Sequence, residues 1–137
     1  MERKEQAFIE RQRVAHLATA DAVGHPHVVP VCFALAGGCI WIAIDEKPKR
    51  TLRLKRLSNI EANPQVSLVF DTYDEDWSRL GYVLVQGLAE VVEGGQEHRQ
   101  ALAALRERYP QYGQMALEAR PAIRVRPEKT VSWGQLG

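Results

Sequence analysis

The sequence lacks the motifs that mark two common classes of enzyme. Neither GxGxxG nor GxSxG occurs in its 137 residues, so it indicates neither a Rossmann dinucleotide site nor a hydrolase nucleophile elbow. Cysteine is scarce, because only Cys32 and Cys39 are present. Their spacing matches no common zinc pattern, and we expect reduced, buried thiols. His25 and His27 could share a strand face and begin a metal site, but no third ligand is placed, so we expect no metal.

The sequence also lacks a secretory signal. Its N-terminus, MERKEQAFIERQR, has no apolar core of the kind that signal peptides carry, and we expect a cytoplasmic protein. Residues 22–44 contain no formally charged side chain and are long enough to span a bilayer. This stretch also contains Pro26, Pro30 and Gly37-Gly38, which favour two buried strands around a turn. We therefore expect no membrane association.

What is present is typical of one soluble domain over residues 1–137. Hydrophobic residues make up 45% and charged residues 26%, as in ordinary globular proteins with a single core. Period-two runs rich in Val, Ile and aromatics indicate strands, and amphipathic runs indicate helices. We predict helices at 3–13, 51–62 and 96–109, and strands at 14–20, 27–35, 39–44, 65–73 and 80–92, with short strands within 122–133.

The order of these elements predicts the fold class. About six strands in hairpin-like succession favour an antiparallel sheet closed into a barrel, so we expect a mainly β protein with inserted helices. A hairpin is predicted around Ala36-Gly37-Gly38. Pro30 cannot donate to a strand ladder, so its strand is expected to be an edge or to be bulged. Gly87 lies inside a predicted strand, where a glycine often marks a bulge, so we expect a bend there.

The segment KPKRTLRLKR, residues 47–56, is the most unusual feature. It carries six cationic side chains and no acid, while the rest of the chain holds 12 basic and 17 acidic residues. Leu54, Leu57 and Ile60 recur at three-residue spacing and predict a helix with one apolar and one cationic face. Such a face could simply be solvated. However, cations at a helix N-terminus after a strand also favour a compact anion such as a phosphate.

A family resemblance sharpens this interpretation. The stretches KPKRTLRLKRLSNIEANPQVS and DTYDEDWSRL, preceded by RVAHLATADAVGHPHVVP, resemble the pyridoxamine 5′-phosphate oxidase-like split-barrel flavoproteins. The likeness runs from residue 8 to the end of the chain and is greatest to the branch that uses the deazaflavin coenzyme F420. It implies a split β-barrel of the FMN-binding type that forms a homodimer, with cofactor sites at the subunit interface.

The resemblance also implies which residues bind the cofactor. The ring would lie against strand residues 28–32 and 42–44, and the second subunit would close the site. The cofactor phosphate would meet cations that follow the third strand. The implied cofactor-binding residues are Val29, Pro30, Val31, Cys32 and Ala43 for the ring, Lys47, Lys49, Arg50, Lys55 and Arg56 for the phosphate, and Trp77, Ser78 and Trp133 from the second subunit.

The resemblance implies an oxidoreductase that uses F420, or FMN as the alternative, to transfer hydride to or from a small molecule. The surplus cations would suit the acidic tail of F420. The cofactor carries the hydride, so no catalytic acid or base is assigned. A non-catalytic flavin- or heme-binding module is the alternative. We expect no nucleic-acid partner, because no base-stacking aromatic lies within residues 47–56.

Overall fold

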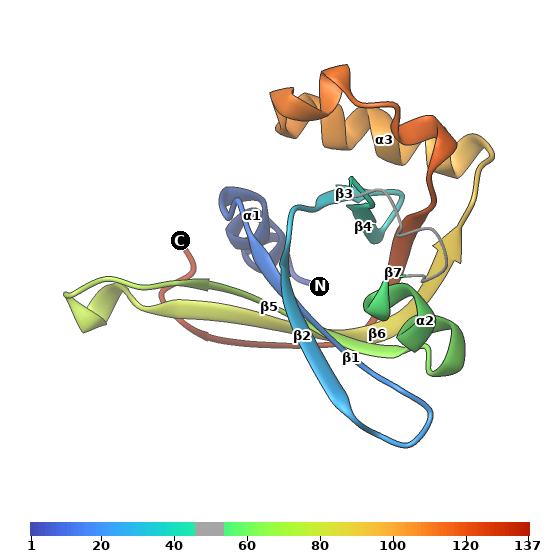
Figure 1. Cartoon of the computed structure of the whole chain (residues 1–137). Coiled ribbons are helices and arrows are strands. Elements are labelled where there is room, and N and C mark those ends of the chain that lie inside the picture. Colours follow the sequence, from blue (N-terminus) through green and yellow to red (C-terminus); the bar gives the residue numbers. More distant parts are fainter. Residues whose placement is uncertain (46–53) are drawn as a thin grey trace.

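The computed structural model describes residues 1–45 and 54–137, and its centre is one curled antiparallel sheet (Figure 1). In the described part the sheet has seven strands in the order β2-β1-β5-β6-β7-β4-β3. The predicted mainly β, split-barrel class is confirmed. The strands are β1 (Ala15–Ala20), β2 (Pro26–Val31), β3 (Ala34–Ala36), β4 (Cys39–Ala43), β5 (Gln65–Thr72), β6 (Gly81–Val92) and β7 (Ala122–Gly134).

The helices flank this sheet. They are α1 (Arg3–Arg11), α2 (Lys55–Ala62) and α3 (Gln96–Arg108), and short 3-10 turns are η1 (Trp77–Arg79), η2 (Pro110–Gln114) and η3 (Leu117–Ala119). The first and last predicted helices are confirmed. The helix predicted at 51–62 is described from Lys55 onward, and residues 51–53 lie outside the described residues. No helix in the described ranges has the length and apolar character needed to cross a membrane.

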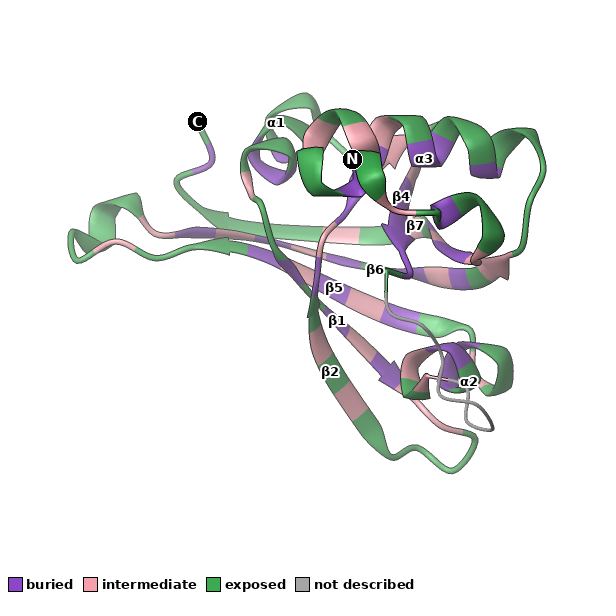
Figure 2. Cartoon of the chain, turned by 45° about the horizontal axis from the view of Figure 1, so that its top comes forward, coloured by how far each residue is buried: buried purple, intermediate pink, exposed green. Residues whose placement is uncertain are grey.

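Alternating burial along the strands creates the main core. In β6 the residues from Gly81 to Ala89 are buried at every second position, as a half-covered strand requires. Phe8 and Ile9 of α1 and Leu57 and Ile60 of α2 pack against this inner face. A second cluster lies beneath α3, which covers β3 and β4 (Figures 1 and 2). Helices α1 and α2 therefore cover one face of the sheet, and α3 covers the other face at β3 and β4. The rest of that second face carries partly exposed side chains.

The predicted hairpin is confirmed, but its first strand is shorter than expected. Gly37 and Gly38 have φ values of 60° and 78°, which a two-residue type I′ turn requires. They join β3 to β4. The run predicted as one strand at 27–35 is wrong in extent, because its first part pairs with β1 and only residues 34–36 pair with β4. The break at Cys32 and Phe33 carries the chain from one edge of the sheet to the other.

The strand pairing also tests the predictions made for Gly87, for residues 122–133 and for Pro30. The register between β6 and β7 shifts at Gln86/Gly87, which confirms the bend at Gly87. Opposite that shift, Pro127 lies inside a single continuous strand, so the two short strands expected within 122–133 are one, β7. Pro30 lies in β2, an outermost strand of the sheet, as predicted.

Candidate functional site

A pocket lies where the two ends of the sheet's strand order approach each other. It has a volume of about 260 Å³ and is bounded by the last residues of β2 and β4, the first turn of α2 and the turn η2. Five of the residues implied by the family resemblance line it. The lining residues are Val14, Pro30, Val31, Cys32, Ile42, Ala43, Asp45, Arg56 and Tyr112.

Strand ends provide the apolar part of this pocket. Val31 is 8% exposed, and Ile42 and Ala43 are also buried. β2 and β4 share no ladder, since β2 lies at one edge of the sheet and β4 lies next to the opposite edge. They meet because the sheet curls, and the pocket lies between the ends of the two strands. A planar apolar group fits such a surface better than a long polar one.

Arg56 brings a positive charge to this apolar surface. It lies in the first turn of α2, where free backbone N–H groups also favour anions. The helix is held in place from its other side, because Leu57 and Ile60 are 1% and 3% exposed within the main core. The predicted division into an apolar and a cationic face is therefore present in the described part of the helix. Arg56 carries the charge that faces the pocket, and its neighbour Leu57 packs in the core.

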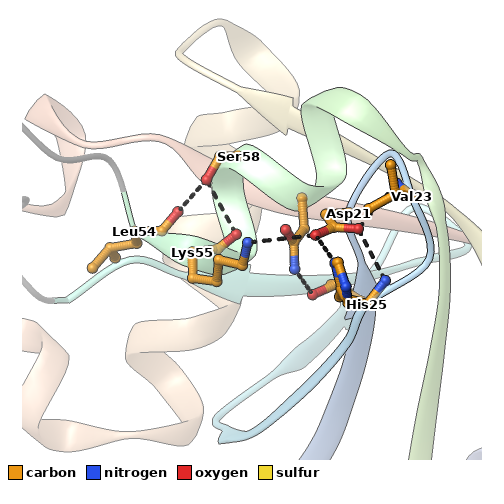
Figure 3. A network of polar contacts seen from close by, with 8 residues as sticks. Asp21, Val23, His25, Leu54, Lys55 and Ser58 are labelled. Atoms are coloured by element: carbon orange, nitrogen blue, oxygen red, sulfur yellow. Dashed lines mark hydrogen bonds and ion pairs between the residues drawn. The ribbon is translucent and has the colours of Figure 1, made fainter.

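Lys55, the residue before Arg56, contacts a different part of the molecule (Figure 3). Its ammonium lies 4.0 Å from the carboxylate of Asp21 in the turn between β1 and β2. Asp21 also accepts hydrogen bonds from the backbone and ring of His25, which lower the pKa of this carboxyl to about 2. Lys55 does not line the pocket. It ties α2 to the β1–β2 turn instead.

Val29 also lies outside the pocket lining. Side chains alternate along a strand, so Val29 points to the opposite side from Pro30 and packs against the main core. His27 lies on the same side as Val29 and opposite Thr19 of β1. Lys47, Lys49 and Arg50 lie outside the described residues.

Of the three residues assigned to a second subunit, Trp77 and Ser78 lie at the far end of the β5–β6 hairpin, and Trp133 lies beside it on β7, paired with Tyr82. This hairpin extends beyond the helices as an arm, with η1 at its tip (Figure 1). Trp77 is 71% exposed, and Ser78 hydrogen-bonds Asp76 at 2.7 Å. Trp133 is 53% exposed and stacks on Tyr82, with ring centroids 5.9 Å apart. None of the three lines the pocket of its own chain.

Sequence reasoning missed Asp45 and Tyr112. Tyr112 is 5% exposed, and its hydroxyl donates to Oδ2 of Asp45 at 3.4 Å. Burial, with smaller effects from Cys32 and Asp45, raises the pKa of the Tyr112 phenol. Arg120 donates to the backbone oxygen of Asp45 at 2.6 Å. The sequence carries no signal for this pairing, because 67 positions separate Tyr112 from Asp45 and only the fold brings them together.

The sheet face opposite α1 and α2 carries a row of partly exposed residues next to the pocket. Cross-strand pairing aligns them from β2 to β7, and the row begins at Pro30, which itself lines the pocket. Neighbours in such a row share one face of the sheet. The row is Pro30, His16, Val69, Leu84 and Val131. We call it the outer row. Any molecule that covered the outer row would also reach the mouth of the pocket.

The chain belongs to the pyridoxamine 5′-phosphate oxidase family, because the model of that family matches residues 1–134. The resemblance expected from the sequence is thereby confirmed at the level of the family. No curated protein sequence matches the chain significantly.

Solved structures support the same fold. A conserved hypothetical protein from Mycobacterium tuberculosis is 26% identical with a TM-score of 0.77, and the match covers 98% of this chain and 85% of that one. A heme storage protein from Vibrio cholerae is 22% identical with a TM-score of 0.72, covering 94% and 90% of the two chains. A FAD-binding protein from Mesorhizobium loti is 22% identical with a TM-score of 0.71, covering 96% and 94%. The last two likenesses concern the fold alone.

Proposed function

We propose that the protein is an oxidoreductase that binds a flavin-type cofactor in the pocket and transfers hydride to or from a small molecule. The observation that carries this proposal is one pocket in which apolar strand ends and the cation Arg56 come together. Membership of the pyridoxamine 5′-phosphate oxidase family supports it. The arrangement suits a ligand with a planar apolar ring at one end and an anionic group at the other.

The residues present fit such a cofactor. Val31, Ile42 and Ala43 offer an apolar surface to a ring, and Arg56 offers charge-assisted hydrogen bonds to a phosphate. The volume of about 260 Å³ is below the roughly 300–1,000 Å³ usual for ligand pockets. A second wall is therefore part of the proposal. We assign it to a second copy of the chain, with Trp77, Ser78 and Trp133 on the partner side.

The outer row explains how a second copy could supply that wall. Val131 is 39% exposed and Val28, on the same face, is 64% exposed. Apolar surface of this kind next to a half-open pocket is typical of an interface. Pro30 belongs both to the row and to the pocket lining. A homodimer that covers this face would thus bury its apolar surface and, in the same contact, complete the cofactor site.

The cofactor, when bound, supplies the hydride chemistry. The chain's own residues bind and orient it. Val31 and Ala43 would hold the ring and exclude water from one of its faces, and Arg56 would fix the anionic end. The opposite face of the ring would remain for the small-molecule substrate. We assign no catalytic acid or base to the chain, because the hydride transfer itself requires none.

Within this proposal we favour coenzyme F420 over FMN. The reason is the charge of residues 47–56, whose six cations exceed what one phosphate can use. F420 carries further carboxylates on its tail, and exposed pairs of carboxylates with Lys or Arg weaken as salt screens them. We therefore expect F420 to bind more tightly than FMN at low salt, with a difference that shrinks as salt rises.

The test is a titration of the purified protein with FMN and with F420 at two salt concentrations, followed by cofactor fluorescence. Tighter binding of F420 at low salt supports the preferred cofactor. Equal affinities would leave FMN as the cofactor. Absence of binding by both would contradict the proposed function, since the pocket would then serve another ligand.

A second candidate is a module that binds flavin or heme without turnover. The pocket wall holds Cys32 and Tyr112, and thiolate and phenolate are both known axial ligands of heme iron. Burial raises the pKa of Tyr112, which disfavours a phenolate, so Cys32 is the better ligand. Titration with hemin tests the heme form of this candidate: a Soret band that Cys32→Ser shifts would support it, and absence of a hemin spectrum change would exclude heme as the ligand.

A further inference from the structure

We propose that Cys32, Asp45 and Tyr112 form a hydrogen-bond acceptor wall that binds the hydroxyl-bearing chain of the ligand. This assignment rests on the proposed function and deepens it. In a flavin-type cofactor the matching group is the polyol chain between the ring and the phosphate. The wall would therefore fix which way the cofactor lies in the pocket.

The wall is held in place by contacts on its outer side. Arg120 donates to the backbone oxygen of Asp45 at 2.6 Å, so the second residue after the end of β4 is tethered. The ring of Tyr112 packs edge-on against Tyr109, with centroids 5.6 Å apart. Tyr112 is 5% exposed, and its hydroxyl reaches Asp45 at 3.4 Å. These contacts make the wall a rigid part of the pocket rather than a surface loop.

The remaining hydrogen-bonding capacity of the wall consists mainly of lone pairs. An ionised carboxylate can only accept, and the single proton of the Tyr112 hydroxyl is already directed to Asp45. The thiol of Cys32 is a weak donor and a weak acceptor. The groups that suit this wall are therefore O–H or N–H donors on the ligand. A polyol offers several such donors in a row.

The two ends of the pocket differ in charge. Arg56 can only donate, so it suits a phosphate or carboxylate. Asp45 would repel the same group. A ligand with hydroxyls between an apolar ring and an anion can satisfy both, if its anion lies toward Arg56 and its hydroxyls lie toward Asp45. Asp45 is thus a specificity-determining residue in this proposal, and Tyr112 holds its carboxylate in position.

The test compares ligands that differ in a single part. Riboflavin and lumiflavin share the isoalloxazine ring, but lumiflavin has a methyl group in place of the polyol. FMN adds a phosphate to riboflavin. We expect wild-type protein to bind riboflavin at least about tenfold more tightly than lumiflavin, since a hydrogen bond to a charged group is worth about a factor of ten or more. Asp45→Ala should reduce this ratio by about tenfold, and Tyr112→Phe should reduce it less.

Two controls separate the wall from the rest of the site. Arg56→Ala should lower the preference for FMN over riboflavin while leaving the ratio of riboflavin to lumiflavin unchanged. Glu107→Ala removes an exposed carboxylate on α3 and should change neither ratio. Circular dichroism establishes that each variant folds. If Asp45→Ala does not fold, Tyr112→Phe retains the ring and gives the same comparison.

The outcomes distinguish this inference from the proposed function. An unchanged ratio of riboflavin to lumiflavin in both folded wall variants would overturn the acceptor wall. A wild-type ratio near one, with binding intact, would overturn it as well and leave the proposed function standing. A wild-type protein that binds neither F420 nor any of the three flavins would instead overturn the proposed function, and the acceptor wall with it.

Discussion

The guanidinium of Arg108 lies over the ring of Phe33, 4.8 Å from its centroid, although the two residues come from the end of α3 and the break after β2. The backbone N–H of Phe33 donates to the hydroxyl of Tyr109 at 3.2 Å. That hydroxyl donates in turn to the backbone oxygen of Arg13 at 2.9 Å. Three separate segments are therefore joined directly beside Cys32, at the edge of the pocket.

We predict that Tyr109→Phe lowers the free energy of unfolding by about 1–3 kcal/mol, because the buried N–H of Phe33 would lose its acceptor. Urea unfolding measures this change. Tyr73→Phe is the matched control, since Tyr73 is 66% exposed and such surface changes cost less than about 0.5 kcal/mol. Equal losses in the two variants would show that the Tyr109 hydroxyl does not hold these segments together.

The first turn of α2 should separate stability from binding by mutation. Leu57→Ala should cost about 2–5 kcal/mol of stability because the side chain is buried in the main core. Arg56→Ala should weaken FMN binding on the order of 10-fold to 100-fold with little change in melting temperature. Lys55→Ala is the matched cation control, because Lys55 faces Asp21. If Lys55→Ala and Arg56→Ala weaken binding equally, the pocket assignment of Arg56 is wrong.

The outer row should form the dimer interface. We expect light scattering to give about twice the chain mass of 15.4 kDa, and Val131→Asp to give the single-chain mass, because a buried unpaired carboxylate disfavours association. Val23 lies in the β1–β2 turn and is 78% exposed. The control variant Val23→Asp should therefore leave the mass unchanged. If the wild-type protein has the mass of one chain, the proposal that a second copy supplies the second wall of the cofactor site is wrong.

Acid should destabilise the β1–β2 turn through Asp21. Hydrogen bonds from the backbone and ring of His25 lower the pKa of Asp21 to about 2 in the folded chain. A lowered pKa means that folding favours the ionised form, so its contribution is present above the unfolded pKa of about 3.9 and is lost as the pH falls toward about 2. Over this pH range the melting temperature of the Asp21→Asn variant should therefore fall less than that of the wild type.

The matched control for this acid effect is Asp71→Asn, which changes an exposed carboxylate on β5. It should follow the wild-type pH dependence. Melting curves recorded at successive pH values measure all three proteins. A pH dependence of Asp21→Asn that matches wild type would show that the turn contributes nothing to acid stability.

Several parts of the fold could be predicted because local chemistry determines them. Gly37 and Gly38 allow the positive φ values that a tight hairpin needs. Pro30 cannot donate a backbone hydrogen bond to a neighbouring strand, which places its strand at an edge. Leu57 and Ile60 follow the helical period and are buried. Each of these predictions depends on the residue itself and its near neighbours in sequence.

The missed features depend on partners that are distant in sequence. The apolar character of residues 27–35 continues through the break at Cys32 and Phe33, so no local signal marks where one strand ends. Short strands are predicted within 122–133, but β7 continues through Pro127 because the ladder is already shifted opposite, at Gly87. Tyr112 follows a helix and a proline, in a segment that reads as an ordinary turn. Its place in the pocket follows only from how α3 packs on β4.

The prolines of β2 also affect how the protein behaves in concentrated solution. β2 has only one strand neighbour, so its other side is open to strand addition by a misfolded or neighbouring molecule. A proline is tolerated in a paired strand where its nitrogen faces away from the partner, so Pro26 and Pro30 withhold two donors from the open side. Pro30, which lines the pocket, thereby also helps Pro26 to make this edge a poor template for aggregation.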